Sequence, residues 1–291
     1  YMEYLLHIGV MILIYTVITV SSNLLIGLSN QISLGQAALY AIGAYITALC
    51  TMILGLTMIP TMLVVILVNA MLSFLLAIPA IRLKGDFFIL TTLAFQFIIY
   101  SILYNMTPVT GGSDGIAGIP APSLLSLVSL DTTLSIFILA LLIAILVIIL
   151  FYHFFYSPFG RALVAMREDE IALKVLGRST RNLKIWTFVV SSAFIGLASY
   201  LYASYMSYIN PGAFNLEESI FILIAVLIGG VGTIRGSVAG ALFVILLPEG
   251  LRLIGLPDLY AAPVHQMIYG LVLIFLMFVR PGGLIGKFSL R

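Results

Sequence analysis

Long apolar stretches run through this sequence almost from end to end, and they constrain the fold more than any other feature. A helix needs roughly 20 mostly apolar residues to cross the hydrocarbon core of a bilayer. We predict spanning helices at residues 4–28, 36–56, 59–81, 86–105, 132–156, 186–208, 219–233, 237–254 and 264–280. The expected fold is therefore all-α, a polytopic transmembrane helix bundle.

The scarcity of charge leads to the same conclusion. Only 8% of the residues are charged and 62% are hydrophobic, whereas a soluble domain carries about 25% charged residues. This charge cannot cover a water-exposed surface, so the apolar surface must face a lipid bilayer. The formal net charge of +2 argues against nucleic acid as a partner, because nucleic-acid-binding proteins carry a clustered basic face. The first stretch lacks an A-x-A-like cleavage site, and we expect a span rather than a signal peptide.

The seventh and eighth stretches are short and meet at the glycine-rich run 229–236, so they are either two crossings or one re-entrant pair. The chain is thus expected to have eight or nine spans. A second polar interruption covers residues 29–36. Freed backbone groups at membrane depth need partners, and broken helices in transporters often line the substrate path. The alternative is close helix packing through small residues such as Gly35, Gly43, Gly236 and Gly240.

The candidate translocation-path residues are accordingly Asn30, Gln31, Ser33, Gly35, Gln36, Gly229, Gly230 and Gly232. Path-lining and packing are about equally supported for the first interruption, and packing is favoured for the second. If the first interruption does line the path, the helix start near Gln36 could offer backbone amides to a substrate carboxylate.

Basic residues set the expected orientation. The segment 157–185 contains six of them, Arg161, Arg167, Lys174, Arg178, Arg181 and Lys184, and loops rich in lysine and arginine face the cytoplasm. Alternation from this loop puts the N-terminus, the loops 55–58 and 106–131, and Glu217 and Glu218 outside. It puts Arg235 and the C-terminal Arg280, Lys287 and Arg291 inside. The whole chain, 1–291, is expected to be one membrane domain containing this cytoplasmic loop.

Catalytic and metal sites find little support. His7, His153 and His265 are far apart, with no carboxylate at metal-ligand spacing, and Cys50 is the sole cysteine. The run 282–288 resembles a phosphate-binding loop only superficially, since Pro281 replaces the first glycine and Phe288 the hydroxyl residue. Glu249 and Arg252, three residues apart, are expected to form a structural ion pair. No metal or cofactor is therefore expected on this chain, and any ATP hydrolysis must come from another chain.

The loop 157–185 contains a predicted short helix at residues 169–177. Asp169 can cap its start, Gly177 suits the left-handed position after its end, and Glu170 and Lys174 can pair across one turn. Helical spacing places an apolar stripe on one face, formed by Ala165, Met166, Ala172, Leu173 and Leu176, with Arg167, Glu170 and Lys174 pointing away. So short a helix is unstable alone and must dock, either on its own bundle or in a partner's groove. Burial in the lipid interface is the alternative.

Several blocks of sequence, in order along nearly the whole chain, resemble one family. They are residues 33–38 with 43–45, 84–93, 110–116, 161–172 with Gly177, 229–240 and 280–284. Together they are similar to the permease subunits of branched-chain amino-acid ABC importers. The motif 110–116 and Lys84 most resemble the second, M-type permease of that family.

This resemblance implies partners and site residues. The expected partners are a paralogous permease, two cytoplasmic ATPase subunits that bind ATP and magnesium, an external substrate-binding protein and the lipid of a prokaryotic inner membrane. The loop helix would be the coupling helix that lies in a cleft of the ATPase. The coupling residues would be Arg167, Glu168, Asp169, Glu170, Ala172, Leu173, Leu176 and Gly177. The external loop would be represented by Gly111, Gly112, Asp114 and Gly115.

The resemblance implies import of branched-chain or related amino acids, with no enzymatic activity in this chain. Two other classes stay open on the residues alone. One is a secondary transporter or channel that works without ATP, and the other is an assembly subunit that has no path of its own.

Overall fold

The structure, a computed structural model, describes residues 2–83, 85–124, 128–129 and 132–253, together with 264, 267–268, 270–272, 274–275 and 283–286. Most of the ninth predicted span, 264–280, lies outside the described residues. So do Lys84, His265, Arg280, Lys287 and Arg291, and the side chain of Arg252.

The described chain is helical except for short turns and two-residue strands. In order, its elements are α1 (Met2–Asn23), the π-helix η1 (Leu24–Leu28), α2 (Gln36–Met52), α3 (Met58–Ala80), α4 (Asp86–Asn105), α5 (Thr107–Thr110), the 3₁₀ helix η2 (Gly112–Asp114), β1 (Ile116–Ala117), β2 (Ser123–Leu124), β3 (Val128–Ser129), α6 (Thr133–Tyr156), α7 (Pro158–Glu168), α8 (Glu170–Val175), α9 (Thr180–Met206), β4 (Tyr208–Ile209), the 3₁₀ helix η3 (Pro211–Phe214), α10 (Leu216–Gly229) and α11 (Ile234–Leu253).

Five described helical segments are long and apolar enough to cross a membrane: Met2–Leu28, α3, α4, α6 and α9. The shorter α2 matches the second predicted span. The fourth predicted span and α4 have the same bounds, because Gly85 precedes the apolar run and Met106 ends it. The transmembrane helix bundle expected from the sequence is confirmed. The number of crossings stays a prediction.

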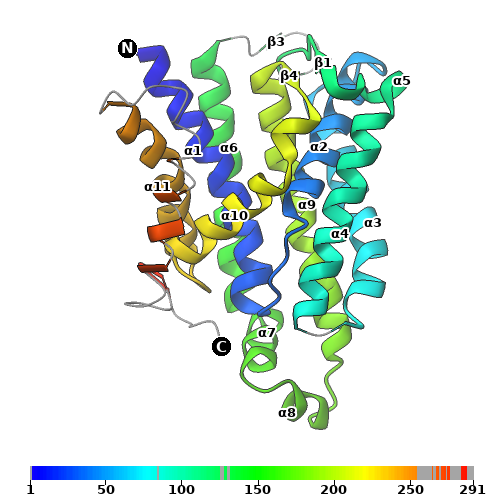
Figure 1. Cartoon of the computed structure of the whole chain (residues 1–291), viewed down its shortest axis with the longest axis vertical. Coiled ribbons are helices and arrows are strands. Elements are labelled where there is room, and N and C mark those ends of the chain that lie inside the picture. The colour runs from blue at the N-terminus through cyan, green and yellow to red at the C-terminus, as the bar shows by residue number, and fades with distance from the viewer. Residues whose placement is uncertain are drawn as a thin grey trace.

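The seventh and eighth predicted spans correspond to α10 and α11. α10 has 14 residues, a length of about 21 Å, against roughly 30 Å for the hydrocarbon core. It descends obliquely through the lower half of the bundle, and α11 returns upward beside it (Figure 1).

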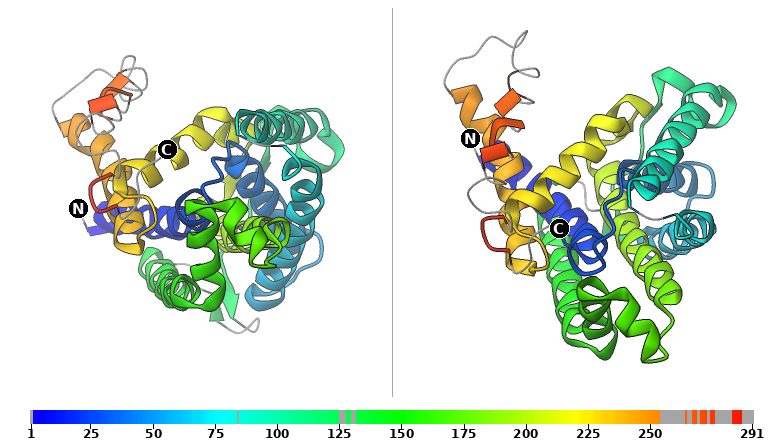
Figure 2. Two further views of the ribbon diagram at one scale, coloured as in Figure 1. Left: turned by 90° about the horizontal axis from the view of Figure 1, so that it is seen from below. Right: turned by 60° about the horizontal axis from the view of Figure 1, so that its bottom comes forward.

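The bundle has two packed groups of helices. α2 and α3 pack on α9, with α4 alongside, while α1 packs on α6, α10 and α11. α1 also contacts α9, which joins the two groups. Figure 2 shows both groups from below, with α7 and α8 lying across their lower end.

Buried polar side chains connect α1 to the start of α11. The amide nitrogen of Asn23 donates to the carbonyl oxygens of Gly230 at 3.1 Å and Thr233 at 3.0 Å. The amide oxygen of Asn23 accepts from the backbone N–H of Gly232 at 2.9 Å. Asn23 is fully buried. Its hydrogen bonds satisfy backbone groups at the turn between α10 and α11, which would otherwise lack partners at membrane depth.

Close approach of α10 and α11 depends on glycine. A β-carbon added to Gly240 would lie 1.9 Å from the carbonyl oxygen of Ala225, and one on Gly229 would lie 2.1 Å from that of Gly236. Both distances are impossible contacts, so only glycine permits this packing. The structure therefore favours helix packing over path-lining for the second interruption.

The end of the molecule that carries the N-terminus also carries the small strands (Figure 1). β1 pairs antiparallel with β4, and β2 with β3. α7 and α8 lie at the opposite end, as the predicted orientation requires of the basic loop (Figure 1).

Candidate functional site

The loop between α6 and α9 folds as two short helices joined at Asp169. The carboxylate of Asp169 accepts hydrogen bonds from the backbone N–H groups of Ile171 at 2.8 Å and Ala172 at 2.9 Å, which caps the start of α8. Gly177 has φ +78°, the left-handed conformation that suits glycine after a helix end. Glu170 and Lys174 pair at 2.9 Å. The predicted short helix and its caps are confirmed.

The predicted apolar stripe is wrong in its orientation. Asp169 is extended, with φ −151° and ψ 103°, so α7 and α8 do not share one axis and the 100° spacing cannot be carried across it. Leu173 is buried at 7% exposure, whereas Leu176 is 78% exposed. Leu173 therefore packs on its own bundle and is not part of an outward coupling surface. The exposed apolar side chains of this segment are Ile171, Ala172, Val175 and Leu176, and we name them the α8 surface.

Glu170 points toward the bundle. Its carboxylate accepts hydrogen bonds from Lys184 at 2.8 Å and Thr180 at 3.1 Å, both at the start of α9. Burial alone would raise the pKa of Glu170, but the bonds from Lys184 and Lys174 outweigh it and lower the pKa to about 2. α8 is thus held on α9 by an ionised carboxylate.

Arg167 also points toward the bundle. Its guanidinium donates a hydrogen bond to the main-chain carbonyl oxygen of Gly27 in η1. Burial lowers the pKa of the Arg167 guanidinium from its usual value. The loop segment is thereby bonded directly to the end of the first span. Glu168, at the end of α7, is exposed.

The structure brings two predicted path residues, Asn30 and Gln31, and two predicted coupling residues, Arg167 and Glu170, to one cavity. This cavity, of about 410 Å³, lies where the first interruption, the connection between α3 and α4, and the loop helices meet, and we call it the lower cavity. Its lining residues are Ser29, Asn30, Gln31, Ile32, Ile81, Leu83, Gly85, Asp86, Phe88, Ile89, Met166, Arg167, Glu170 and Lys184. Part of the first interruption and part of the loop therefore line the same cavity.

The backbone amides of the first interruption already have partners within the chain. The N–H of Leu34 donates to the hydroxyl of Thr92 at 3.1 Å, and that of Ala37 donates to the hydroxyl of Ser219 at 3.0 Å. The N–H of Gly35 donates to Ser33 at 3.2 Å. The hypothesis that this helix start offers amides to a carboxylate is therefore not supported at these three positions.

The other candidate path residues lie away from the lower cavity. Ser33, Gly35 and Gln36 are buried beside α4 and α10. Gly229, Gly230 and Gly232 are buried at the turn between α10 and α11. None of these six residues lines the lower cavity or the upper cavity described below.

The external-loop residues form a compact turn at the upper end of the molecule. Gly112 and Asp114 lie in η2, and Gly111 and Gly115 flank it. The hydroxyl of Tyr208 in β4 donates to the carbonyl oxygen of Asp114 at 2.9 Å. The turn is therefore held against the end of α9, and the Asp114 side chain is left at the surface.

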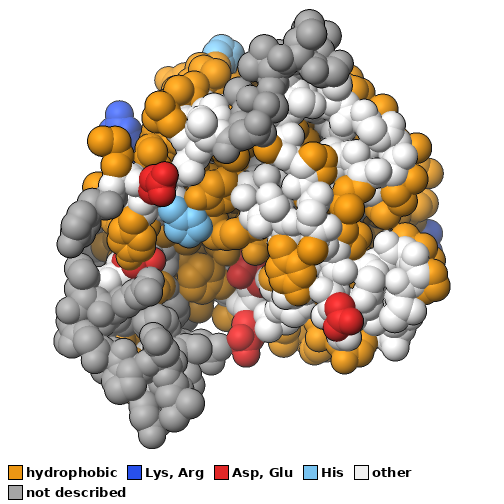
Figure 3. Space-filling model, turned by 90° about the horizontal axis from the view of Figure 1, so that it is seen from above, with side chains coloured by type: hydrophobic (Ala, Val, Ile, Leu, Met, Phe, Trp, Pro, Cys, Tyr) orange, Lys and Arg blue, Asp and Glu red, His pale blue; other side chains and the backbone are white. Residues whose placement is uncertain are grey.

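A second cavity opens near the N-terminal end of the bundle, between α1, η3, α10 and α11, and we call it the upper cavity. Its volume is about 490 Å³, and its polar lining includes His7, Tyr15, Glu217, Glu218 and Glu249. Figure 3 shows acidic and histidine side chains bordering a hollow in this face. The described residues that line it include three carboxylates and no lysine or arginine. Such a cavity attracts a positively charged group and repels a free carboxylate.

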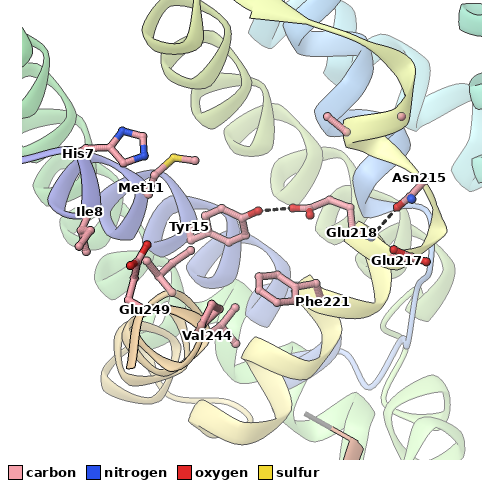
Figure 4. Close-up of a pocket in the computed structure, with 14 residues that line it drawn as sticks. His7, Ile8, Met11, Tyr15, Asn215, Glu217, Glu218, Phe221, Val244 and Glu249 are labelled. Carbon is pink, nitrogen blue, oxygen red and sulfur yellow. Dashed lines mark hydrogen bonds between the residues drawn. The ribbon is translucent and has the colours of Figure 1, made fainter. Parts of the chain in front are cut away.

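Glu218 lies deeper than the sequence indicates. Its carboxylate accepts a hydrogen bond of 2.6 Å from the hydroxyl of Tyr15, which is in the middle of α1 (Figure 4). Asn215 caps α10 by accepting from the backbone N–H of Glu218 at 3.2 Å. The Asn-x-x-Glu spacing before an apolar run is the one sequence signal that could have indicated a helix start here. Tyr15 gave no such signal.

Two other polar residues singled out from the sequence, His7 and Glu249, have partners in distant segments of the chain. The Nδ1 atom of His7 and the hydroxyl oxygen of Tyr205 lie 2.6 Å apart. The carboxylate of Glu249 accepts a hydrogen bond from the hydroxyl of Tyr4. Within the described part of the chain, no three His, Cys, Asp or Glu side chains gather in a way that could hold a metal ion.

Comparison with known proteins agrees with the resemblance seen in the sequence. Residues 4–277 match the family described as branched-chain amino acid transport system / permease component. The chain is 31% identical to the high-affinity branched-chain amino acid transport system permease protein LivM of Escherichia coli, over 96% of this chain and 69% of that protein. It is 29% identical to the probable permease LivM of Methanocaldococcus jannaschii, over 72% of this chain and 62% of that protein.

A more distant relative is named for a different substrate. The autoinducer 2 import system permease LsrC of Photorhabdus laumondii is 30% identical over 41% of this chain and 37% of its own length. No solved structure matches the chain significantly.

Proposed function

The chain belongs to the family of branched-chain amino acid transport permeases, and from this premise we propose that it imports branched-chain amino acids across a prokaryotic inner membrane. It is the membrane-spanning permease of an ABC importer. In this proposal it forms the translocation path with a paralogous permease. Two ATPase subunits bind below, and a substrate-binding protein docks above.

The observation that carries the proposal is the match over 96% of the chain to a permease whose name states this substrate. The contacts of the loop segment support the ATPase part of it. The α8 surface is apolar and exposed, although it belongs to a charged loop. An apolar helix face of this kind is suited to a groove in a partner protein.

The hydrogen bonds of the loop suggest how movement would pass to the membrane. An ATPase that moves α8 also moves Glu170 against α9 and Arg167 against Gly27. Both contacts are made by side chains facing the lower cavity. A shift of the loop would therefore change the wall of the path between its open and closed states, which is how differential contacts drive a two-state change. Asn30 and Gln31 are the path residues of this proposal.

Reconstitution tests the function. The chain, the paralogous permease and the two ATPases of the same organism are assembled in proteoliposomes with the binding protein outside. We expect uptake of labelled leucine that requires ATP, the binding protein and both permeases. Uptake by this chain alone without ATP would instead establish a secondary transporter. ATP-driven uptake of another solute but not of leucine would leave the permease in place and refute the substrate.

A further inference from the structure

The lining of the lower cavity is complementary to a neutral aliphatic amino acid. Its lining includes aliphatic and aromatic side chains, among them Ile32, Ile81 and Phe88, and charged side chains of both signs. Its volume of about 410 Å³ lies within the roughly 300–1,000 Å³ of typical small-molecule sites. Apolar walls with a few polar groups are the usual composition of such sites.

The charges of this cavity balance. Arg167 and Lys184 are positive, and Asp86 and Glu170 are negative. Glu170 is already engaged by Lys184 and Lys174, while Asp86 forms no ion pair with any described side chain. A ligand with one carboxylate and one ammonium keeps this balance, whereas a ligand with net charge breaks it. The upper cavity differs, because its charged lining is acidic only.

Gln31 points independently to a ligand. It lines the lower cavity, it is only 7% exposed, and neither polar atom of its amide has a hydrogen-bond partner within the described structure. A buried polar group without a hydrogen-bond partner is destabilising, and a ligand that pairs with it removes that penalty. Both amide atoms of Gln31 are buried behind the cavity wall, so a ligand reaches them when the side chain rotates toward the cavity. The amide can then accept from an ammonium group or donate to a carboxylate.

We propose that the lower cavity is a substrate site on the cytoplasmic side, which takes a neutral amino acid with an aliphatic side chain as it leaves. Gln31 and Arg167 serve its carboxylate and Asp86 its ammonium group, and its side chain lies against Ile32, Ile81 and Phe88. The inference rests on the proposed function, since it assigns the place from which this substrate is released.

Protection of an engineered cysteine tests the site. Cys50 is the sole cysteine of the chain and is buried, so the experiment uses Leu83→Cys in a Cys50→Ala background. Leu83 lines the lower cavity and is 42% exposed. The full transporter is first shown to import leucine with ATP, and labelling by a maleimide is then timed without ATP. We expect saturating L-leucine to slow labelling at least threefold, and equal concentrations of L-glutamate or L-lysine to leave it unchanged.

A second cysteine distinguishes occupancy from a general closing of the protein. Tyr156→Cys in the same background lies at the end of α6 and outside the α8 surface, is 67% exposed and does not line the cavity. Its labelling should be the same with and without leucine. Equal protection at both positions, or protection by charged amino acids at Leu83→Cys, would overturn the site.

Matched glutamine variants test the assignment of Gln31. Gln31→Leu should abolish leucine protection at Leu83→Cys. Gln36→Leu should retain it, because Gln36 is a second buried amide without a described partner that lines neither cavity. Asp86→Asn is at an exposed position and should weaken protection without affecting assembly.

Failure of the lower-cavity site and failure of the proposed function give different results. Absence of protection in a complex that imports leucine refutes the lower-cavity site and leaves the proposed function standing. Protection that persists in both Gln31→Leu and Asp86→Asn also refutes it. Absence of ATP-driven leucine import refutes the function itself.

Discussion

Arg167 and Gly27 are 140 residues apart in the sequence, and the guanidinium of one donates a hydrogen bond to the main-chain carbonyl of the other. This bond joins the loop segment to the end of the first span. We predict that Arg167→Met reduces leucine uptake about ten- to a hundredfold while ATP hydrolysis continues. A hydrogen bond from a charged group contributes roughly 1.5–3 kcal/mol, and about 1.4 kcal/mol is a tenfold change in an equilibrium. Uptake and ATPase rates are measured together in proteoliposomes.

Arg161→Met is the control for this prediction. Arg161 is exposed in the same helix, and among the described residues its guanidinium reaches only the nearby carbonyl oxygen of Tyr156, at 3.4 Å. Uptake should be nearly unchanged. Equal losses in the two variants would show that the positive charge of the loop matters and the bond to Gly27 does not.

Leu176 and Leu173 should respond in opposite ways to substitution. Leu176 is 78% exposed and Leu173 is 7% exposed. Leu176→Asp should abolish co-purification of the ATPase subunits and leave the melting temperature of the isolated chain unchanged. Leu173→Ala should lower the stability of the chain by roughly 2 kcal/mol, as truncation of a buried leucine does. Retention of the ATPases by Leu176→Asp would refute the α8 surface as their docking site.

The attachment of α8 to α9 should depend on pH only in acid. The folded pKa of Glu170, about 2, lies below its ordinary value of about 4.3. The carboxylate therefore contributes its full stabilisation above about pH 4.3, and this stabilisation is lost as the pH falls toward 2. Hydrogen exchange of residues 170–176, corrected for the intrinsic rate, should therefore become faster as the pH is lowered from about 4.3 toward 2. In Glu170→Gln the exchange should be raised already at pH 7 and show no acid transition.

Two glycines of α11 provide a test of the packing between α10 and α11. Gly240→Ala should lower the melting temperature sharply, since its β-carbon would lie 1.9 Å from the carbonyl oxygen of Ala225. Gly250→Ala is the matched control in the same helix, because its β-carbon meets no described atom within 4 Å. It should be neutral, or stabilising by roughly 0.5–1 kcal/mol through helix propensity. Similar melting temperatures for the two variants would contradict the close contact.

The features predicted correctly from the sequence are those that depend on residues close together in the chain. Apolar length places α3, α4 and α6 within a few residues, and the cap and end of α8 follow from Asp169 and Gly177. These features depend on neighbours in the chain, so periodicity and capping preferences suffice to find them.

The predictions that were wrong or missing concern contacts between distant segments of the chain. The extended backbone at Asp169 separates the predicted stripe, so that Leu173 is buried and Leu176 is exposed, because a fixed 100° spacing assumes an unbroken helix. The amides near Gly35 are satisfied by Thr92 and Ser219, which belong to other helices. No local pattern indicates such partners.

The hydrogen bonds of Asn23 impose an order on biosynthesis. The carbonyl oxygen that its amide needs belongs to Gly230, 207 residues later, which a ribosome reaches after roughly 10–40 s at 5–20 residues per second. The helices that pack on α1 (α6, α9, α10 and α11) also come later in the chain. An amide without partners in hydrocarbon costs several kcal/mol. The α1 segment therefore stays near the interface, or beside other protein, until the start of α11 has been synthesised and provides the partners of Asn23.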